Sequence, residues 1–396
     1  MKKVLCVVLC LLFSIPFSIL SVSADNKLEN ETDARIHSEY YPEDYIGYRY
    51  PVLPGTSTWP YGDHRKMVEM CQIPEDIYES MTTEELAQSV LAYPLLSDIY
   101  AYDSITMGLE RVAENFDGLQ EFYTRSDNAS CLVDLYSKHD CVSMSELSVN
   151  TKQVLTDRCS IATTPEEKVL CKRVLYSMKL SAFLSQDEFI ERLSLSDVQT
   201  IATTNNELRA TNAWHIYDFD KYTVGTTSIM TPKNVTVEVS IKDAIIFITD
   251  GNGNNYYSIE DDLPDVCKTA INTDFYELYG IMPVEEPTVE YNCHSYAWYR
   301  QSDCMYWMDN SVVPTARRGY TSVSQSDLAA NDRVVYKDGN NSIHSAIVQS
   351  VSWGAGEYGP PFIMLISKWG MAGLYEHSIS NCPYPPDTDS YEYYTP

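Results

Sequence analysis

The stretch NCHSYAWY, residues 292–299, carries the strongest structural signal in the chain. Pro287 and Val289 precede it and indicate an extended approach. Asn292 is a favourable N-cap residue, so we expect a short helix that begins at Cys293. The first turn of a helix has unpaired backbone N–H groups and a positive dipole end, and both favour a thiolate over a thiol. A lowered thiol pKa is what nucleophilic catalysis requires of a cysteine.

Two β-rich segments follow this helix. NDRVVY at residues 331–336 and IHSAIV at residues 343–348 are separated by polar turn residues. This order predicts a strand, a hairpin and a second strand. His344 stands at the start of the second strand, from which we expect its ring to face a groove. A further apolar strand is expected over residues 363–366, directly before Ser367.

A helix-opening cysteine, an Asp-containing strand and a His-x-Ala-Ile-Val strand together resemble the CHAP and NlpC/P60 group of papain-like cysteine hydrolases. In such families the strand before the catalytic histidine often opens with Gly-Asp, and Asn331-Asp332 stands in that place. The His344 strand is similar to the family pattern Gly-His-Val-Ala-Ile-Val. The resemblance spans roughly residues 285–382, a normal size for a compact domain. It implies a Cys–His pair that attacks an amide, commonly in bacterial cell-wall peptides.

These families orient the catalytic histidine with a third polar residue on the following strand. CHAP-like domains use Glu or Asn there, and NlpC/P60-like domains use His, Asn or Gln. The corresponding stretch of this chain offers Ser367 and Lys368. A lysine ammonium cannot accept a hydrogen bond from imidazole, whereas a serine hydroxyl can. Ser367 is therefore the candidate orienting residue, and His377 is the alternative.

Other polar residues nearby have weaker claims to a function. His294 adjoins Cys293 but points to another helical face, so we expect a structural role for it. Tyr291 is a candidate polar helper. The region holds several residues of zinc-ligating type: Cys293, His294, His344, His377 and Cys382. No Cys-x-x-Cys or paired-histidine spacing supports a zinc site, so we expect neither a metal nor another cofactor.

The N-terminus has the features of an export signal. Lys2 and Lys3 precede an apolar run over residues 4–20, and small residues at 22–24 form a cleavage site. An uncleaved membrane anchor is the alternative. No later stretch is long and apolar enough to cross a bilayer. We therefore expect a signal peptide over residues 1–24 and a secreted protein without a membrane span after cleavage.

Charge and cysteine content narrow the partners and the redox state. The chain has 28 basic and 56 acidic residues, a net charge of −28. Such a surface repels nucleic acid and anionic membranes. The resemblance implies a peptide or peptidoglycan substrate as the partner. Of 11 cysteines, Cys6 and Cys10 leave with the signal, so an odd number remains. Four disulfides plus a free Cys293 fit that count, and reduced, buried cysteines fit it equally.

The region upstream of the cysteine helix is expected to form helices first and strands later. Thr82 with Glu85, and Thr164 with Glu167, form capping boxes before apolar stripes at helical spacing. Alternating and β-branched residues at 236–249 indicate a small β region. The predicted organisation is a signal peptide (1–24), an extended leader (25–60), a helical accessory domain (61–210), a β-rich connecting region (211–284), the hydrolase domain (285–384) and a disordered tail (385–396).

Taken together, the sequence predicts an α+β fold whose C-terminal domain packs the Cys293 helix on an antiparallel sheet carrying His344. The predicted function is that of a secreted thiol protease or amidase. It cleaves an amide bond through a Cys293 thioester, with His344 as general base and acid. The alternative is a non-catalytic secreted binding or structural protein that retains a papain-like fold. The lack of an acid or amide after His344 motivates that alternative.

Overall fold

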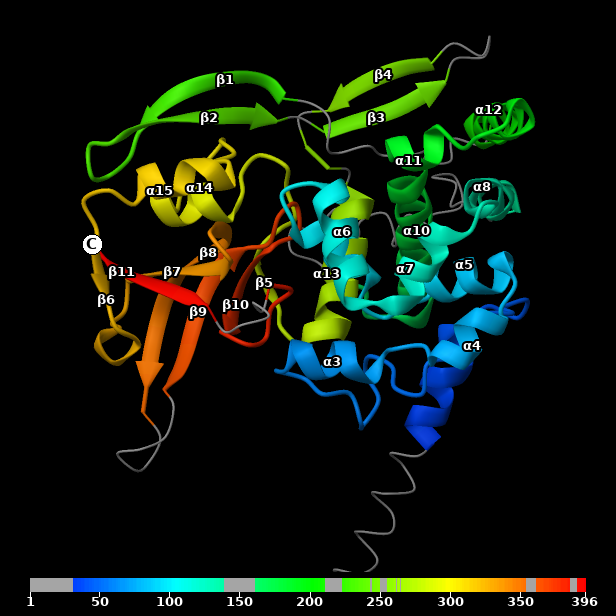
Figure 1. Cartoon of the computed structure of the whole chain (residues 1–396), viewed down its shortest axis with the longest axis horizontal. Helices are drawn as coiled ribbons and strands as arrows, with labels where there is room; N and C mark the ends of the chain where they lie inside the picture. The colour runs from blue at the N-terminus through cyan, green and yellow to red at the C-terminus, as the bar shows by residue number, and fades with distance from the viewer. Residues whose placement is uncertain are drawn as a thin grey trace, which may run out of the picture.

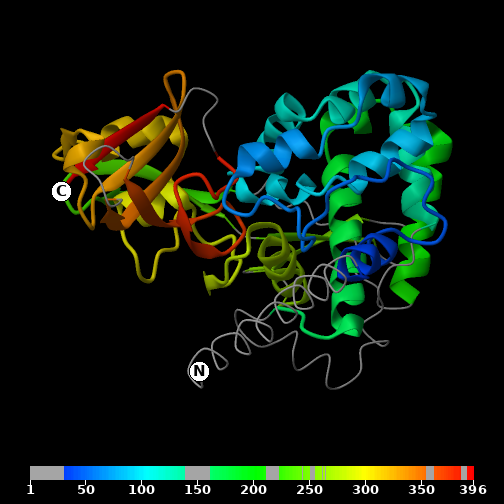
Figure 2. The same ribbon diagram turned by 90° about the horizontal axis from the view of Figure 1, so that it is seen from below.

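The computed structural model describes residues 31–138, 161–210, 223–242, 244–249, 255–260, 262–263, 265–353, 361–384 and 390–396. The predicted signal peptide lies outside these residues. Helices occupy most of the first half of the chain and strands most of the second, so the fold is α+β. Figure 1 shows the helices on one side of the molecule and the largest sheet on the other, and Figure 2 shows the same division from below.

Several helices of the helical half begin at residues whose side chains cap them. Its elements are α3 (His64–Met70), α4 (Glu75–Ser80), α5 (Thr83–Leu91), the 3-10 helix η1 (Leu96–Ala101), α6 (Ile105–Asn115), α7 (Asp117–Thr124), α8 (Asn128–Lys138), α10 (Pro165–Leu184), α11 (Asp187–Ile190) and α12 (Leu195–Ala210). Both predicted capping boxes are confirmed. The Thr82 hydroxyl accepts from the Glu85 N–H at 3.2 Å, and the Glu85 carboxylate accepts from the Thr82 N–H at 2.8 Å. Thr164 and Glu167 repeat this pair of bonds at the start of α10.

Within the described residues, seven strands form an antiparallel sheet in the order β5-β10-β9-β8-β7-β11-β6. The strands are β5 (Pro283–Glu285), β6 (Thr321–Val323), β7 (Arg333–Asp338), β8 (Asn341–Ser352), β9 (Phe362–Lys368), β10 (Leu374–Ser378) and β11 (Tyr391–Thr395). The hairpin β7–β8 and the strand β9 confirm the order predicted from the sequence. Two separate hairpins pair β1 (Thr223–Met230) with β2 (Thr236–Lys242) and β3 (Ala244–Thr249) with β4 (Asn255–Glu260).

The two faces of the large sheet belong to different cores. Val335, Ile347 and Ile366 face the helices α14 (Cys293–Trp298) and α15 (Val313–Ala316), which the β1–β2 hairpin covers (Figure 1). Their neighbours along the strands face the other way. Tyr336, Ala346, Val348 and Leu365 join the large core of the helical half. This alternation follows from the two-residue repeat of a strand.

A helix that the sequence did not reveal joins the sheet to the helical half. The helix α13 (Asp265–Tyr279) packs on α10 within the region expected to be β-rich. The Phe275 ring lies 5.8 Å from the ring of Trp369 and 5.9 Å from that of Tyr375. Tyr279 meets Trp369 edge to face at 5.0 Å. The domain boundaries stay a prediction, but the buried core crosses them without a break.

The ends of the described chain differ from the sequence predictions. Residues 31–40 are helical, and the rings of Tyr41 and Tyr50 are buried in the core, so this segment is no extended leader. Near the C-terminus, β11 pairs with β7 and β6 where a disordered tail was expected. Alternating tyrosines explain the strand, because aromatic residues favour β structure and every second ring packs on the sheet. Composition alone had hidden both features.

No disulfide joins any two of the described cysteines, which makes the four-disulfide arrangement wrong. These cysteines are Cys71, Cys131, Cys171, Cys267, Cys293, Cys304 and Cys382. Most of these side chains are buried and act as small apolar core residues, the alternative that the count had left open. Among the residues that the structure describes, no helix is long and apolar enough to span a membrane.

If one core joins helices and sheet, Phe275→Ala should lower the free energy of unfolding by about 3–5 kcal/mol, because it leaves a cavity between α13 and the sheet. Urea unfolding followed by far-UV circular dichroism and by tryptophan fluorescence should shift together. Tyr276→Ala is the matched control, since Tyr276 is 39% exposed. A sheet signal that is lost while the helical signal persists would instead favour separate domains.

Candidate active site

Asn292 fixes the start of the cysteine helix, as predicted. Its side-chain oxygen accepts hydrogen bonds from the backbone N–H groups of Ser295 at 3.1 Å and Met308 at 3.2 Å. Its amide nitrogen donates to the Met308 carbonyl at 2.9 Å and to Asp103 Oδ1 at 3.1 Å. The side chain is only 1% exposed and its amide is fully used. Cys293 therefore occupies the first position of α14 with little freedom to move.

The Cys293 thiol lies against the backbone of β8. The backbone N–H groups of Ser345 and His294 and the Lys368 ammonium lower the pKa of this thiol. Burial nevertheless dominates and raises the pKa of Cys293 well above its usual value, and the Asp103 carboxylate adds to this effect. The expectation of a thiolate is therefore wrong for this conformation. A helix of six residues, buried under the helical half, offers too little positive potential to offset desolvation.

His344 precedes Ser345 on β8, so its side chain points to the face opposite that of the Ser345 side chain. Its ring is fully buried and stacks on the ring of Tyr384, with centroids 3.8 Å apart and planes 8° from parallel. Neither ring nitrogen has a hydrogen-bond partner among the described residues. Burial lowers the pKa of His344 well below its usual value, so the ring is neutral. The predicted groove beside His344 is filled by Tyr384.

The structure brings Ser367 to His377, not to His344. The His377 Nδ1–H donates to the Ser378 carbonyl at 2.9 Å, which leaves Nε2 to accept the Ser367 hydroxyl proton at 2.7 Å. Trp369 Nε1–H donates to the same hydroxyl oxygen at 3.0 Å. Burial lowers the pKa of His377 to about 4, so this ring is neutral as well. Ser367 therefore serves the neighbouring histidine in this conformation.

His294 has the structural role expected for it. Its Nδ1 bonds to the Ser345 hydroxyl at 2.8 Å, and Trp298 Nε1–H donates to the same hydroxyl at 2.8 Å. Its Nε2 lies 2.7 Å from the side-chain amide of Asn310. These bonds fasten α14 to β8 at the residue after His344. Tyr291, the candidate polar helper, instead bonds to Glu285 and stacks beside Tyr296.

The opening of β7 has the backbone geometry that glycine usually provides. Asn331 has a φ of 71°, a left-handed conformation that asparagine tolerates better than most residues. Its N–H donates to the Val348 carbonyl at 2.8 Å, and the Asp332 carboxylate accepts from the Ala329 N–H at 2.8 Å. Asn331-Asp332 thus starts β7 in register with β8. The carboxylate of Asp332 therefore stabilises this turn.

Lys368 is a buried cation that sequence reasoning assigned no role. Its ammonium donates to the carbonyls of Thr288 at 3.0 Å, Gly370 at 2.7 Å and Ala372. Burial lowers the pKa of Lys368 from 10.5 to about 7, while neighbouring Asp262 and Cys293 act in the opposite direction. The charge of Lys368 can therefore change near neutral pH. The protonated form of Lys368 favours negative charge on Cys293, and this form is lost as the pH rises through about 7.

The helical half covers the cysteine and histidine directly. The Tyr384 hydroxyl donates to the Ala101 carbonyl, and the Tyr102 hydroxyl donates to the Pro383 carbonyl at 2.7 Å. The rings of Tyr102 and Tyr384 meet edge to face at 5.1 Å. Asp103 follows these residues and reaches Asn292. No local sequence pattern could have shown this cover, because the partners lie far apart in the chain.

The described residues contain no group of three or more histidine, cysteine or acidic side chains arranged to hold a metal ion. No protein-family model, curated protein sequence or solved structure matches this chain. The site must therefore be interpreted from its own geometry. That geometry is a neutral thiol at the start of α14, a neutral imidazole on β8 under the ring of Tyr384, and a lysine of lowered pKa.

The lysine gives a pH test of the site. Because the pKa of Lys368 is depressed in the folded protein, the unfolded chain binds more protons between pH 7 and 10, and stability rises with pH across that window. In urea titrations from pH 7 to 10, the unfolding free energy of the wild type should therefore rise relative to that of Lys368→Met. Lys66→Met, at an exposed position, should show no such divergence. Parallel pH profiles for the wild type and Lys368→Met would contradict the assigned shift.

The tyrosine cover gives a second test. Cys293 should alkylate slowly in the wild type, because its thiol is buried and protonated. Tyr384→Ala should raise the iodoacetamide rate at Cys293 at least about tenfold, since it uncovers the imidazole and admits water. Peptide mass spectrometry resolves this cysteine from the others. Tyr306→Ala, which removes a ring packed on Tyr299, is the control. An equal rate in both variants would show that Tyr384 does not cover the site.

Proposed function

We propose that this chain is a secreted cysteine hydrolase of papain-like architecture that cleaves an amide bond, with bacterial cell-wall peptide as the substrate class. Cys293 is the nucleophile and His344 the general base. The observation that supports the proposal is the contact between α14, which begins at Cys293, and β8, which carries His344: His294 bonds to the Ser345 hydroxyl at 2.8 Å. The cysteine helix α14 and the histidine strand β8 thus pack together, as a thiol hydrolase requires of its nucleophile and its base.

The unpartnered His344 ring supports the role of base. Buried imidazole nitrogens normally find hydrogen-bond partners, and leaving both without one costs stability. Such a cost is typical of a group kept available for a transient partner. In the proposed reaction, His344 takes the proton of the Cys293 thiol as the sulfur attacks the substrate carbonyl carbon. The protonated ring then gives that proton to the leaving amine.

The groups around the sulfur fit the remaining steps. The backbone N–H groups of Ser345 and His294 and the Lys368 ammonium, which act on the Cys293 thiol, carry positive charge that suits a developing oxyanion. Collapse of the tetrahedral intermediate breaks the carbon–nitrogen bond and leaves a thioester on Cys293. Water then attacks the thioester, with His344 accepting its proton, and the thiol is regenerated. Tyr384 must leave the His344 ring before substrate can enter.

A non-catalytic binding or structural role is the second candidate, and the burial of the pair favours it. Cys293 is 2% exposed, His344 is fully covered, and Ser367 bonds to another histidine. A protein that uses this fold only to present a binding surface would not need an accessible Cys293 or His344. The two candidates differ in whether the thiol and the imidazole act together.

Hydrolysis of a panel of peptidoglycan stem peptides tests the proposal. Cys293→Ser and His344→Ala should each lower kcat/KM by about 1,000-fold or more, and the double variant should lose little further, because residues that act as one unit are not additive. Cys71→Ser, which alters another buried free thiol, should retain turnover. Circular dichroism checks that each variant is folded.

Two results would contradict the hydrolase. Equal turnover by the wild type and Cys293→Ser would remove Cys293 from the chemistry. The absence of turnover by both the wild type and Tyr384→Ala, together with slow alkylation of Cys293 in both, would establish the non-catalytic role.

A further inference from the structure

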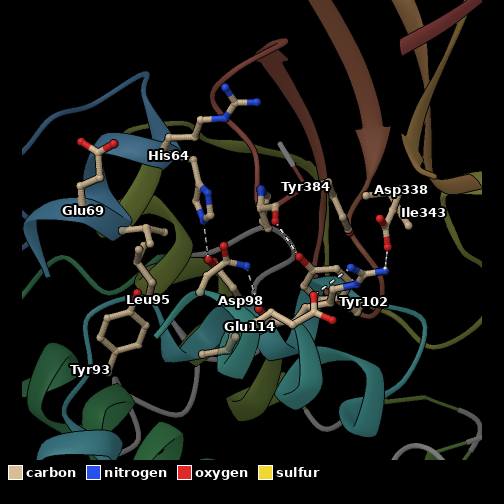
Figure 3. A pocket seen from close by; sticks show the side chains of 16 residues that line it. His64, Glu69, Tyr93, Leu95, Asp98, Tyr102, Glu114, Asp338, Ile343 and Tyr384 are labelled. Carbon is tan, nitrogen blue, oxygen red and sulfur yellow. Dashed lines mark hydrogen bonds and ion pairs between the residues drawn. The ribbon is translucent and has the colours of Figure 1, made fainter. Parts of the chain in front are cut away.

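A separate pocket lies on the other side of Tyr384. It has a volume of about 280 Å³ and opens between α3 and α6 of the helical half and the β7–β8 hairpin (Figure 3). Tyr384 forms part of its wall, whereas Cys293 and His344 do not line it. A pocket of this size suits a small molecule or a single side chain.

The apolar part of the pocket wall is aromatic. Tyr93, Tyr102 and Tyr384 line it, and Figure 3 shows the three rings around the space. The hydroxyls of Tyr102 and Tyr384 already donate to backbone carbonyls. These two residues therefore offer the pocket mainly ring surface. The face of an aromatic ring carries partial negative charge and attracts cations.

The charged part of the wall is predominantly acidic. Two arginines, Arg65 and Arg111, stand against the carboxylates of Glu69, Asp98, Glu114 and Asp338. The Arg111 guanidinium is already held between Glu114 at 2.9 Å and Asp338 at 2.7 Å. Glu69 forms no ion pair with a described residue. The pocket therefore has an excess of negative charge, in a protein whose net charge is −28.

His64 supplies a buried acceptor at this wall. Its Nε2–H donates to Asp98 Oδ2 at 2.8 Å, and the Tyr279 hydroxyl donates to Asp98 Oδ1 at 2.6 Å. With Nε2 as the donor to Asp98, Nδ1 is the ring nitrogen that can accept a hydrogen bond. That nitrogen is buried and has no hydrogen-bond partner among the described residues, and His64 as a whole is 8% exposed. An N–H donor from a ligand would satisfy it.

We propose that this pocket is a binding site for a primary ammonium group on an aliphatic chain, such as the basic side chain of a peptide. The ammonium donates to His64 Nδ1, lies against the tyrosine rings and is neutralised by Glu69. The aliphatic stem packs against Leu95 and Val112 on the same wall. A carboxylate ligand would meet four acidic groups and two arginines, of which Arg111 is already paired, so the net charge of the wall opposes an anion.

The site does not depend on hydrolysis at Cys293. It shares one ring, Tyr384, with the cover of His344, but its own recognition groups come from α3, η1 and α6. Binding is therefore measured on full-length Cys293→Ser, in which turnover cannot interfere. Loss of hydrolase activity and loss of ammonium binding are then separate results.

Isothermal titration calorimetry with cadaverine is the experiment, with glutarate as the anionic probe of equal carbon number. Cadaverine should bind at one site and glutarate should not. Glu69→Gln should weaken cadaverine about threefold to fivefold, the effect expected of one exposed charge. Glu79→Gln removes an exposed carboxylate on α4 outside the pocket and should leave the affinity unchanged. His64→Phe keeps a ring but removes the acceptor, and should weaken binding at least about tenfold.

Three outcomes would overturn the proposal. One is binding of glutarate but not cadaverine, and another is no heat from cadaverine at millimolar concentration. The third is equal weakening by Glu69→Gln and Glu79→Gln, which would assign the attraction to overall charge. Because Glu69 is exposed, its variant is expected to fold even if His64→Phe is not.

Discussion

The pleat of β8 is the constraint on which the rest of the site depends. Successive side chains of a strand point to opposite faces, so Ser345 must face α14 if His344 faces the large core. The Ser345 hydroxyl joins His294 and Trp298 to the strand. The cysteine helix is therefore anchored by the neighbour of His344 and not by His344 itself. A register shift of one residue would exchange the faces of His344 and Ser345 and would remove the Ser345 anchor from α14.

Local signals predicted local structure well, since each involves residues a few positions apart. The Asn292 cap, the two capping boxes and the β7–β8 hairpin all belong to this class, and the α+β fold class follows from their order. The burial and protonation of Cys293 and His344 depend on long-range contacts, which leave no local pattern in the sequence. Asp103 bonds to a residue 189 positions away, and Tyr384 to one 283 positions away. The thiolate expectation failed for the same reason, because the burial that raises the pKa of Cys293 comes from segments outside its helix.

The helical half consequently has a different relation to the site from that of an accessory domain. Residues 101–103 reach the start of α14, and α13 packs its aromatic rings on Trp369 and Tyr375 of the sheet region. Gly370 shows how close this contact is: a Cβ there would lie 2.4 Å from the backbone of Ala101. Any side chain larger than hydrogen at residue 370 would push the two halves apart. The cover over Cys293 and His344 is thus part of the folding core.

The energy that holds Tyr384 over His344 sets how readily a hydrolase of this design could open. Two hydrogen bonds contribute about 0.5–1.5 kcal/mol each, and the aromatic contacts of the ring contribute about as much. The sum is a few kcal/mol, which leaves an open state populated at roughly 0.1–10%. A ligand shifts such an equilibrium only by its differential affinity for the two states. Tyr384 is the one ring that both the ammonium pocket and His344 contact, so occupation of the pocket would be felt at the imidazole through this side chain. The ligand stabilises the rotamer of Tyr384 that gives the ammonium the better cation–π contact. That rotamer decides whether the ring stays over His344 or moves away from it.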